Sequence, residues 1–255
     1  ELKAELEAEA DLWRAQGVDH RLLDATELRH VEPALDDPHA AGRTPAAYHL
    51  PGEAQLRNPW HLRALESACT ARGVRILVRA EVESFVVHGD RLREVRTPVG
   101  SFSAERFCLC AGAWSGPLGE QLGLRLAVKP IRGQIVLLRP SQPVIRGIVY
   151  AGHQFRHYFV PRDDGRILVG STEEDVGFDK QPTAGAAREL LDFALGLAPQ
   201  LAGAPVERTW AGLRPFSSDG LPYLGPAPHL KNVFVAAGHY RWGLALSPIT
   251  AVAMS

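Results

Sequence analysis

Two arginines near the end of the chain stand where an anion could bind. Arg214 lies in the run GLRP, and Arg241 lies in the glycine-flanked loop GHYRWG. A guanidinium keeps its charge when buried, and its planar fork matches the two oxygens of a carboxylate. Glycines allow backbone N–H groups to come close to a ligand because they lack a Cβ. We therefore interpret Arg214 and Arg241 as candidate ligands of a carboxylate.

A structural role for these arginines stays open beside that interpretation. Each could instead pair with a local acid such as Asp219 or Glu207. The surrounding segment is too apolar for a solvated charged surface, which favours a binding site. An apolar stretch at 244–252 predicts a helix whose N-terminus would add partial positive charge beside Arg241.

Further motifs precede these two runs. They are CAGAWS from Cys110, KPIRGQ from Lys129, YFVPR from Tyr158 and GRILVG from Gly165. Together with GLRP and GHYR, they resemble the FAD-dependent D-amino-acid oxidase superfamily, and within it the glycine oxidase-like branch of the thiamine biosynthesis type. The motifs occur in the family's order and cover most of the chain.

The resemblance implies an α/β fold of the mixed α+β kind with two domains. A partial FAD-binding domain of the D-amino-acid oxidase type would comprise residues 56–125 and 213–255. A substrate domain, an antiparallel sheet with helices, would comprise residues 1–55 and 126–212.

The resemblance also implies roles for individual residues. Arg214 and Arg241 would bind the substrate carboxylate, and Tyr158 would line the pocket and hydrogen-bond the substrate. Tyr158 could equally be an amphipathic core residue with a satisfied hydroxyl. Val82 would meet the adenine through its main chain. The flavin would be wrapped by His239, Tyr240, Arg241, Trp242, Gly243, Leu244 and Ala245.

Two departures from the family pattern concern the cofactor. Such flavoenzymes bind the FAD pyrophosphate at a Gly-x-Gly-x-x-Gly turn near their start, but no two of the 24 glycines here are spaced two apart. We therefore expect the middle and C-terminal portion of a longer protein, or a polypeptide cleaved upstream. Trp242 stands where the family commonly has asparagine. No cysteine lies in residues 215–220, the region of covalent attachment in related sarcosine oxidases, so we expect noncovalent FAD.

The implied activity is oxidative deamination of glycine or of small D-amino or N-methyl amino acids. Hydride would pass from the substrate α-carbon to the flavin, and water would hydrolyse the imine to a 2-oxo acid and ammonia. Dioxygen would reoxidise the flavin to give hydrogen peroxide, and no protein base or other catalytic side chain is required. One alternative is a D-amino-acid dehydrogenase that passes electrons to a quinone. Another is a non-catalytic lobe of such an enzyme.

Composition narrows the range of partners. With 28 basic and 29 acidic residues the net charge is −1, which gives no reason to expect nucleic acid or an anionic membrane as partner. No apolar run approaches the roughly 20 residues of a membrane span. The odd number of cysteines, three, favours a reduced, cytoplasmic compartment. A small amino-acid substrate and dioxygen are the expected partners, and a homo-oligomer stays open.

Other chemistries are disfavoured. His153 and His157 are spaced as one helical turn, but the following YFV predicts a strand, which would separate them, so we expect no metal site. The Cys108-x-Cys110 pair lacks the second pair that tetrahedral zinc needs. No Gly-x-Ser-x-Gly nucleophile elbow occurs, which argues against a hydrolase.

Local patterns predict the elements that position these residues. Helices are expected at 1–16, at 59–73 with Asn58 as the N-cap, at 187–197 and at 244–252. Strands are expected at 74–78, at 81–87 and 92–97 as a hairpin, at 106–110 and at 232–237. Cys108 and Cys110 alternate along their strand and should point into the core. Between 126 and 207, apolar strands separated by Gly and Pro predict an antiparallel sheet.

Overall fold

The computed structural model describes residues 2–35, 47–151 and 156–255, which form two compact units. Unit 1 comprises Glu1–Gln55, Arg132–Glu174 and Asp179–Gly212. Unit 2 comprises Leu56–Ile131, Asp175–Phe178 and Leu213–Ser255. The chain passes between the units inside two long strands, β7 (Val128–Leu138) and β11 (Val206–Ser217).

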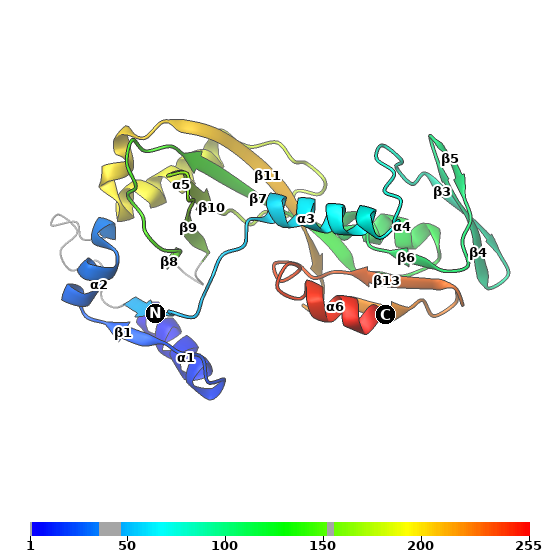
Figure 1. The fold of residues 1–255 in the computed structure, drawn as a ribbon, viewed down its shortest axis with the longest axis horizontal. Helices are drawn as coiled ribbons and strands as arrows, with labels where there is room; N and C mark the ends of the chain where they lie inside the picture. The colour runs from blue at the N-terminus through cyan, green and yellow to red at the C-terminus, as the bar shows by residue number, and fades with distance from the viewer. Residues whose placement is uncertain (1, 36–46, 152–155) are drawn as a thin grey trace. The chain divides into compact units, whose positions relative to one another are not determined.

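Unit 1 is built on a five-stranded sheet in the order β11-β7-β10-β9-β8 (Figure 1). Its shorter strands are β8 (Val149–Ala151), β9 (His157–Pro161) and β10 (Ile167–Gly170). β10 pairs antiparallel with both β7 and β9, and β9 pairs antiparallel with β8. The predicted antiparallel sheet is therefore confirmed.

Helix α5 (Ala184–Leu197) covers this sheet with an apolar stripe. Ala186, Leu190 and Ala194 recur every four residues and are buried, which places them on one face of the helix. Leu190 and Ala194 share a core with Phe159 of β9 and Val169 of β10. The helix begins after Thr183, whose Oγ1 accepts the N–H of Ala186, and it continues into the 3-10 turn η5 (Pro199–Gly203).

The N-terminal part of unit 1 consists of short elements. They are α1 (Leu2–Ala15), β1 (Arg21–Leu23), α2 (Ala25–Val31), η1 (Pro33–Leu35) and β2 (Ala47–His49), with β1 antiparallel to β2. Asp24 and Glu27 form a capping box that starts α2. The buried carboxylate of Glu32 accepts the backbone N–H groups of Arg146 and Gly147, which ties this part to the region before β8.

Unit 2 contains two small sheets. One is a meander of β3 (Ser84–His88), β4 (Arg91–Thr97) and β5 (Gly100–Phe102). The other has the order β12-β13-β6 and comprises β12 (Tyr223–Pro226), β13 (Val233–Ala237) and β6 (Phe107–Leu109). β13 pairs parallel with β6 and antiparallel with β12. The predicted hairpin at 81–97 is confirmed, with strands that begin and end within three residues of the expected positions.

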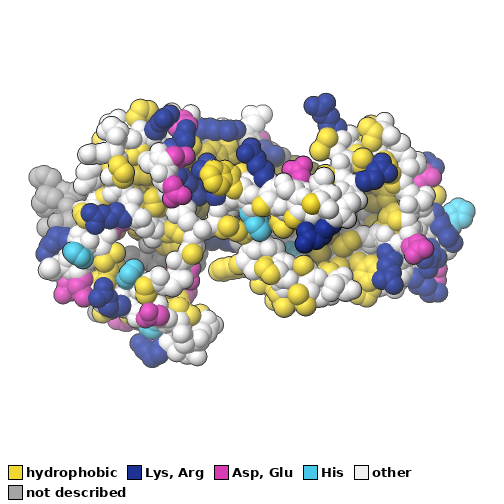
Figure 2. Space-filling view, viewed as in Figure 1, with side chains coloured by type: hydrophobic (Ala, Val, Ile, Leu, Met, Phe, Trp, Pro, Cys, Tyr) yellow, Lys and Arg dark blue, Asp and Glu magenta, His cyan; other side chains and the backbone are white. Residues whose placement is uncertain are grey.

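Four helical segments belong to unit 2. They are α3 (Asn58–Ala71), η3 (Gly112–Trp114), α4 (Ser115–Gln121) and α6 (Ser247–Met254). The predicted helix at 244–252 is confirmed in type but begins three residues later. Figure 2 shows hydrophobic side chains gathered over α6, where Ile249 and Val252 are exposed.

Two predictions around α3 were wrong. The apolar run 74–78 forms no strand, and its Val74, Ile76, Leu77 and Val78 side chains are exposed. A strand requires a neighbour for its backbone hydrogen bonds, and this run has none within the described structure. The N-cap of α3 is Arg57 and not Asn58, and no side chain bonds the helix start, since Asn58 lies one residue inside.

The expected burial of two cysteines was also wrong. Cys108 and Cys110 do lie on one side of the chain, with their Sγ atoms 3.4 Å apart, but both residues are exposed. Although the residue as a whole is exposed, partial desolvation of its thiol and the neighbouring Cys108 thiol raise the pKa of Cys110 to about 11. On the opposite face, Phe107 packs against the core of unit 2, because successive side chains of a strand alternate between faces.

Within the described ranges, no helix is both long enough and apolar enough to cross a membrane.

Candidate anion-binding site

Backbone contacts bring the two sequence-predicted arginines onto neighbouring segments of unit 2. Arg214 lies on β11, and Arg241 lies in the loop that follows β13. The N–H of Tyr240 donates to the carbonyl oxygen of Pro215 over 2.9 Å, and Phe216 and His239 form an isolated antiparallel bridge. Each arginine is therefore one residue away from a hydrogen-bonded pair that joins the loop to the strand.

Two residues of the loop, Gly238 and Tyr240, have positive φ angles and pack against neighbouring side chains. Gly238 has φ +81°, and a Cβ there would lie 3.3 Å from Ser217 Cβ and from Tyr223 Cδ2. Tyr240 has φ +50°, which costs a residue with a side chain on the order of 1–3 kcal/mol. Its ring meets Phe216 edge to face at 5.1 Å between centroids. These contacts explain why the loop turns sharply at the end of β13.

The side chains at the tip of the loop face solvent. Arg241 is exposed, and its guanidinium makes no hydrogen bond or ion pair with the residues that the structure describes. Trp242 is 65% exposed. Arg214 is half-buried on its strand. An exposed cation without an internal partner is available to an anionic ligand.

The acids considered as alternative partners have other hydrogen bonds. Glu207 accepts two hydrogen bonds from Arg166, at 2.7 and 2.8 Å, which hold the pKa of Glu207 below its usual value. Asp219 accepts the backbone N–H of Leu221 at 3.0 Å. Because Arg241 has no partner among the described residues, the salt-bridge interpretation fails for that arginine.

His239 connects the loop to α6. Its Nε2 lies 2.9 Å from Oγ1 of Thr250, and burial lowers the pKa of the imidazole. The ring is therefore neutral at pH 7, where an unperturbed histidine would already be mostly neutral. Its main structural contribution is the link between the end of β13 and the helix.

Tyr158 belongs to the other unit. It lies half-buried on β9, opposite Gly170 of β10 and Tyr150 of β8. The rings of Tyr158 and Tyr150 are 5.7 Å apart. Its suggested contact with substrate stays a prediction.

Val82 belongs to unit 2 and is half-buried just before β3. The neighbouring Glu83 donates its N–H to the carbonyl of Arg96, so the backbone here extends the hairpin. Contact of Val82 with adenine stays a prediction, as do the flavin contacts of residues 239–245.

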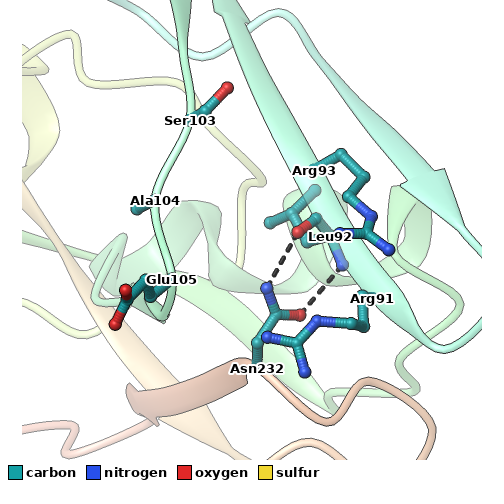
Figure 3. Close-up of a pocket in the computed structure, with 7 residues that line it drawn as sticks. All are labelled: Arg91, Leu92, Arg93, Ser103, Ala104, Glu105 and Asn232. Atoms are coloured by element: carbon teal, nitrogen blue, oxygen red, sulfur yellow. Dashed lines mark hydrogen bonds between the residues drawn. The ribbon is translucent and has the colours of Figure 1, made fainter.

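Two cavities lie outside the predicted site. One, of about 570 Å³, lies beside the β3–β5 meander and is shown in Figure 3, where the Asn232 amide bonds both the N–H and the carbonyl of Leu92. Those bonds fix β4 to the start of β13. A second, of about 620 Å³, borders β12. Neither is lined by Arg214, Arg241 or Tyr158.

Unit 1 contains a buried polar network that the sequence did not lead us to predict. Arg132 is almost fully buried and donates to Glu174 at 2.6 Å and to Asp179 at 2.8 Å. Gln134 donates to the same Glu174 at 2.7 Å. The hydrogen bond with Glu174 raises the pKa of Arg132. The motif KPIRGQ, which supplies both Arg132 and Gln134, was the available signal.

Lys129, the first residue of the motif KPIRGQ, was not predicted as a site residue but lies close to the loop. Its Nζ pairs with Asp175 and lies 5.6 Å from the centre of the Phe216 ring. Phe216 in turn contacts Tyr240. Lys129 therefore supports the strand end on which the loop rests.

No metal site is found in the part of the chain that the structure describes, where no cluster of three or more His, Cys, Asp or Glu side chains occurs. His157 Nε2 lies 3.0 Å from a carboxylate oxygen of Glu189. His153 lies outside the described residues.

Comparison with known proteins gives a consistent family. The sequence profile described as FAD dependent oxidoreductase (DAO) matches residues 1–255. Glycine oxidase of Pseudomonas putida is 39% identical over 243 residues, which cover 95% of this chain and 65% of that protein. The bifunctional protein ThiO/ThiG of Nostoc sp. is 35% identical over 90% of this chain and 34% of that protein.

Comparison with solved structures supports the same family. The crystal structure of glycine oxidase from Geobacillus kaustophilus superposes with a TM-score of 0.89 at 34% identity, covering 98% of this chain and 65% of that chain. The present chain therefore spans somewhat less than two thirds of the length of these two glycine oxidases.

Proposed function

Because the chain belongs to the FAD dependent oxidoreductase family, we propose that the whole protein oxidises glycine or a small D-amino or N-methyl amino acid. The products are a 2-oxo acid, hydrogen peroxide and ammonia, or methylamine in place of ammonia where the substrate is an N-methyl amino acid. The observation that carries the proposal is the hydrogen-bonded junction of β11 with the loop after β13, which brings Arg214 and Arg241 onto adjacent segments. The similarity to proteins named glycine oxidase supports this substrate class.

The residues of this chain fit one end of the cofactor. In the loop from His239 to Ala245, the N–H groups of Tyr240 and Trp242 are bonded to carbonyl oxygens of the protein. The other backbone N–H groups of the loop and the exposed guanidinium of Arg241 form a donor set suited to the negative charge of a reduced flavin. The N-terminus of α6 follows directly. No Gly-x-Gly turn that could hold the pyrophosphate occurs in the sequence. We assign residues 239–245 to the flavin ring system and Val82 to the adenine, with FAD held noncovalently.

The roles of the two units follow from these assignments. Unit 2 carries the arginines and the flavin loop, which supports the proposal that residues 56–125 and 213–255 are the FAD-binding part. Unit 1 carries Tyr158 on its antiparallel sheet, which supports a substrate domain built from residues 1–55 and 126–212.

FAD, when bound, accepts the hydride from the substrate α-carbon. The task of the protein is orientation, which can supply a large part of a rate enhancement. Arg214 and Arg241 hold the carboxylate, and the hydroxyl of Tyr158 donates a hydrogen bond to the substrate. With the carboxylate fixed, the Cα–H bond has few orientations left. No side chain needs to remove a proton.

The direct test is amine oxidation by the whole protein, loaded with FAD, under air. Hydrogen peroxide released in proportion to the 2-oxo acid supports an oxidase. Turnover with a quinone but without peroxide would identify a dehydrogenase. No turnover with any small amino acid would contradict the proposal and favour a non-catalytic lobe.

A first prediction concerns cofactor binding by the 255-residue chain. Because its sequence has no Gly-x-Gly turn for the pyrophosphate, we expect this chain to retain little or no FAD after incubation and gel filtration. Absorbance in the flavin bands, compared with protein absorbance, measures the bound fraction. A stoichiometric flavin signal would show that the loop and the adenine contacts suffice.

A second prediction concerns pH dependence. Only the neutral amine of the substrate has the lone pair that assists hydride loss, so kcat/KM should rise with pH through an ionisation that belongs to the substrate. This ionisation should move when a substrate of different amine basicity is used. The His239→Gln variant should keep the profile, because burial already keeps His239 neutral.

The rival explanation makes His239 a general base. In that case the ionisation would be the same for all substrates and would disappear in His239→Gln. Such a result would replace the proposed mechanism.

The cysteines and one relative bear on the compartment and the pathway of the proposed enzyme. The three cysteines are free thiols, which supports a reducing, cytoplasmic compartment. The relative named ThiO/ThiG supports a role in thiamine biosynthesis. Dioxygen is the proposed electron acceptor.

A further inference from the structure

In unit 1, Gly170 lies directly beneath the ring of Tyr158. Gly170 on β10 is the cross-strand partner of Tyr158 on β9. A Cβ built on Gly170 would lie 2.7 Å from both Cζ and Oη of Tyr158 and 2.8 Å from its Cε2. Real Cβ atoms essentially never approach heavy atoms so closely. The phenol ring therefore lies across the bare Cα of Gly170, with its hydroxyl end over β10.

The other side of the same ring is also occupied. Tyr150 of β8 is the cross-strand partner of Tyr158 on the opposite side, and the two rings lie 5.7 Å apart with 58° between their planes. Directly opposite residues of an antiparallel pair share one face of the sheet. Tyr158 therefore lies between a neighbouring ring and a position without a side chain, and leans toward the latter.

A left-handed backbone does not account for glycine at this position, because the φ of Gly170 lies outside that region. Gly170 is buried, and it ends a strand in which Ile167, Leu168 and Val169 are buried as well. A larger residue would bury more apolar surface there. The Tyr158 ring occupies the space that the Cβ of such a residue would need, so the ring would have to shift.

We infer that Gly170 is a positioning residue that sets where the hydroxyl of Tyr158 is presented to substrate. This inference rests on the proposed function, in which that hydroxyl binds the amino-acid substrate. Any side chain at position 170 would push the ring off β10 toward Tyr150 and move the hydroxyl with it. The glycine thus determines how tightly the site holds its substrate, although it does not touch the substrate.

The first arm of the test measures the position of the ring without enzyme activity. The whole protein, loaded with FAD, is labelled with 3-fluorotyrosine, and the ¹⁹F signal of Tyr158 is identified by its loss in Tyr158→Phe. We expect this signal to shift in Gly170→Ala and to stay in Gly196→Ala. Gly196 is a suitable control because it is exposed on α5 with nothing within 4 Å of its Cβ position.

The first arm also measures the stability of the fold by urea unfolding. Gly170→Ala should lower the urea midpoint of unfolding in the Tyr158 background. In the Tyr158→Leu background it should have little effect, because leucine lacks the Cζ, Oη and Cε2 atoms that the new Cβ would meet. The Tyr158→Leu pair also keeps the test informative where Gly170→Ala alone folds poorly.

The second arm uses steady-state kinetics with glycine. Loss of one hydrogen bond to a charged group should raise KM about tenfold or more in Tyr158→Phe. Gly170→Ala should raise KM by a similar factor, and the double variant no further, because both changes remove the same contact. Gly196→Ala should leave KM unchanged.

Two results would overturn the inference in different ways. If Tyr158→Phe raises KM while Gly170→Ala changes neither KM nor the ¹⁹F signal, Gly170 does not position the ring, and the proposed function is unaffected. If Tyr158→Phe leaves KM unchanged in an active enzyme, the hydroxyl has no role in substrate binding and neither has Gly170. An enzyme that oxidises no amino acid would instead contradict the proposed function, while the ¹⁹F and urea results would still report the coupling.

Discussion

Replacing Arg241 with alanine is expected to reduce kcat/KM for glycine roughly thirtyfold or more in the whole protein loaded with FAD. This factor corresponds to a loss of about 2–5 kcal/mol of binding free energy, and it should appear chiefly as a higher KM. Arg241 is exposed and makes no ion pair within the described residues. Its removal should therefore leave the fold intact. The loss falls on the substrate carboxylate, which would lose a charged and bidentate partner.

Two further variants identify the contribution of the guanidinium. Arg241→Lys should recover only part of the loss, because an ammonium lacks the planar fork. Arg93→Ala is the matched control, since Arg93 is an exposed arginine of unit 2 on the β3–β5 meander. Unchanged kinetics in Arg241→Ala together with lost activity in Arg214→Ala would show that Arg214 alone anchors the carboxylate.

Replacing Phe159 with alanine is expected to lower the free energy of unfolding by about 3–5 kcal/mol, the usual cost of removing a fully buried phenylalanine. Phe159 has no exposed surface, and its ring stacks on Phe193 of α5 at 5.2 Å between centroids. It lies at the centre of the core that joins the sheet of unit 1 to α5. Because Phe159 follows Tyr158, this core also fixes β9 under the candidate substrate residue.

Urea unfolding followed by circular dichroism measures this loss. Leu195→Ala is the control, because Leu195 is on the exposed side of the same helix and its truncation should cost within about 0.5 kcal/mol. A loss below about 1 kcal/mol for Phe159→Ala would show that the core of unit 1 rearranges to fill the space.

The sequence by itself determined the family and most local elements. The motifs GLRP and GHYR led to the prediction that Arg214 and Arg241 bind a carboxylate. The family profile matches all 255 residues. Apolar periodicity predicted α5 and the antiparallel strands correctly, because each reports on contacts with a single neighbouring surface. The hairpin at β3 and β4 was predictable because its turn and both strands are adjacent in sequence.

Only the tertiary structure decided which distant segments meet. The bond between Tyr240 and Pro215, the parallel pairing of β13 with β6, and the fit of Tyr158 over Gly170 join residues that no local pattern connects. The same dependence on distant segments explains why two predictions from the sequence were wrong. The run 74–78 has the composition of a strand and Cys108 that of a core residue, yet neither is covered within the described structure. Apolar composition fixes a preference for burial, whereas burial itself depends on which surface packs against the segment.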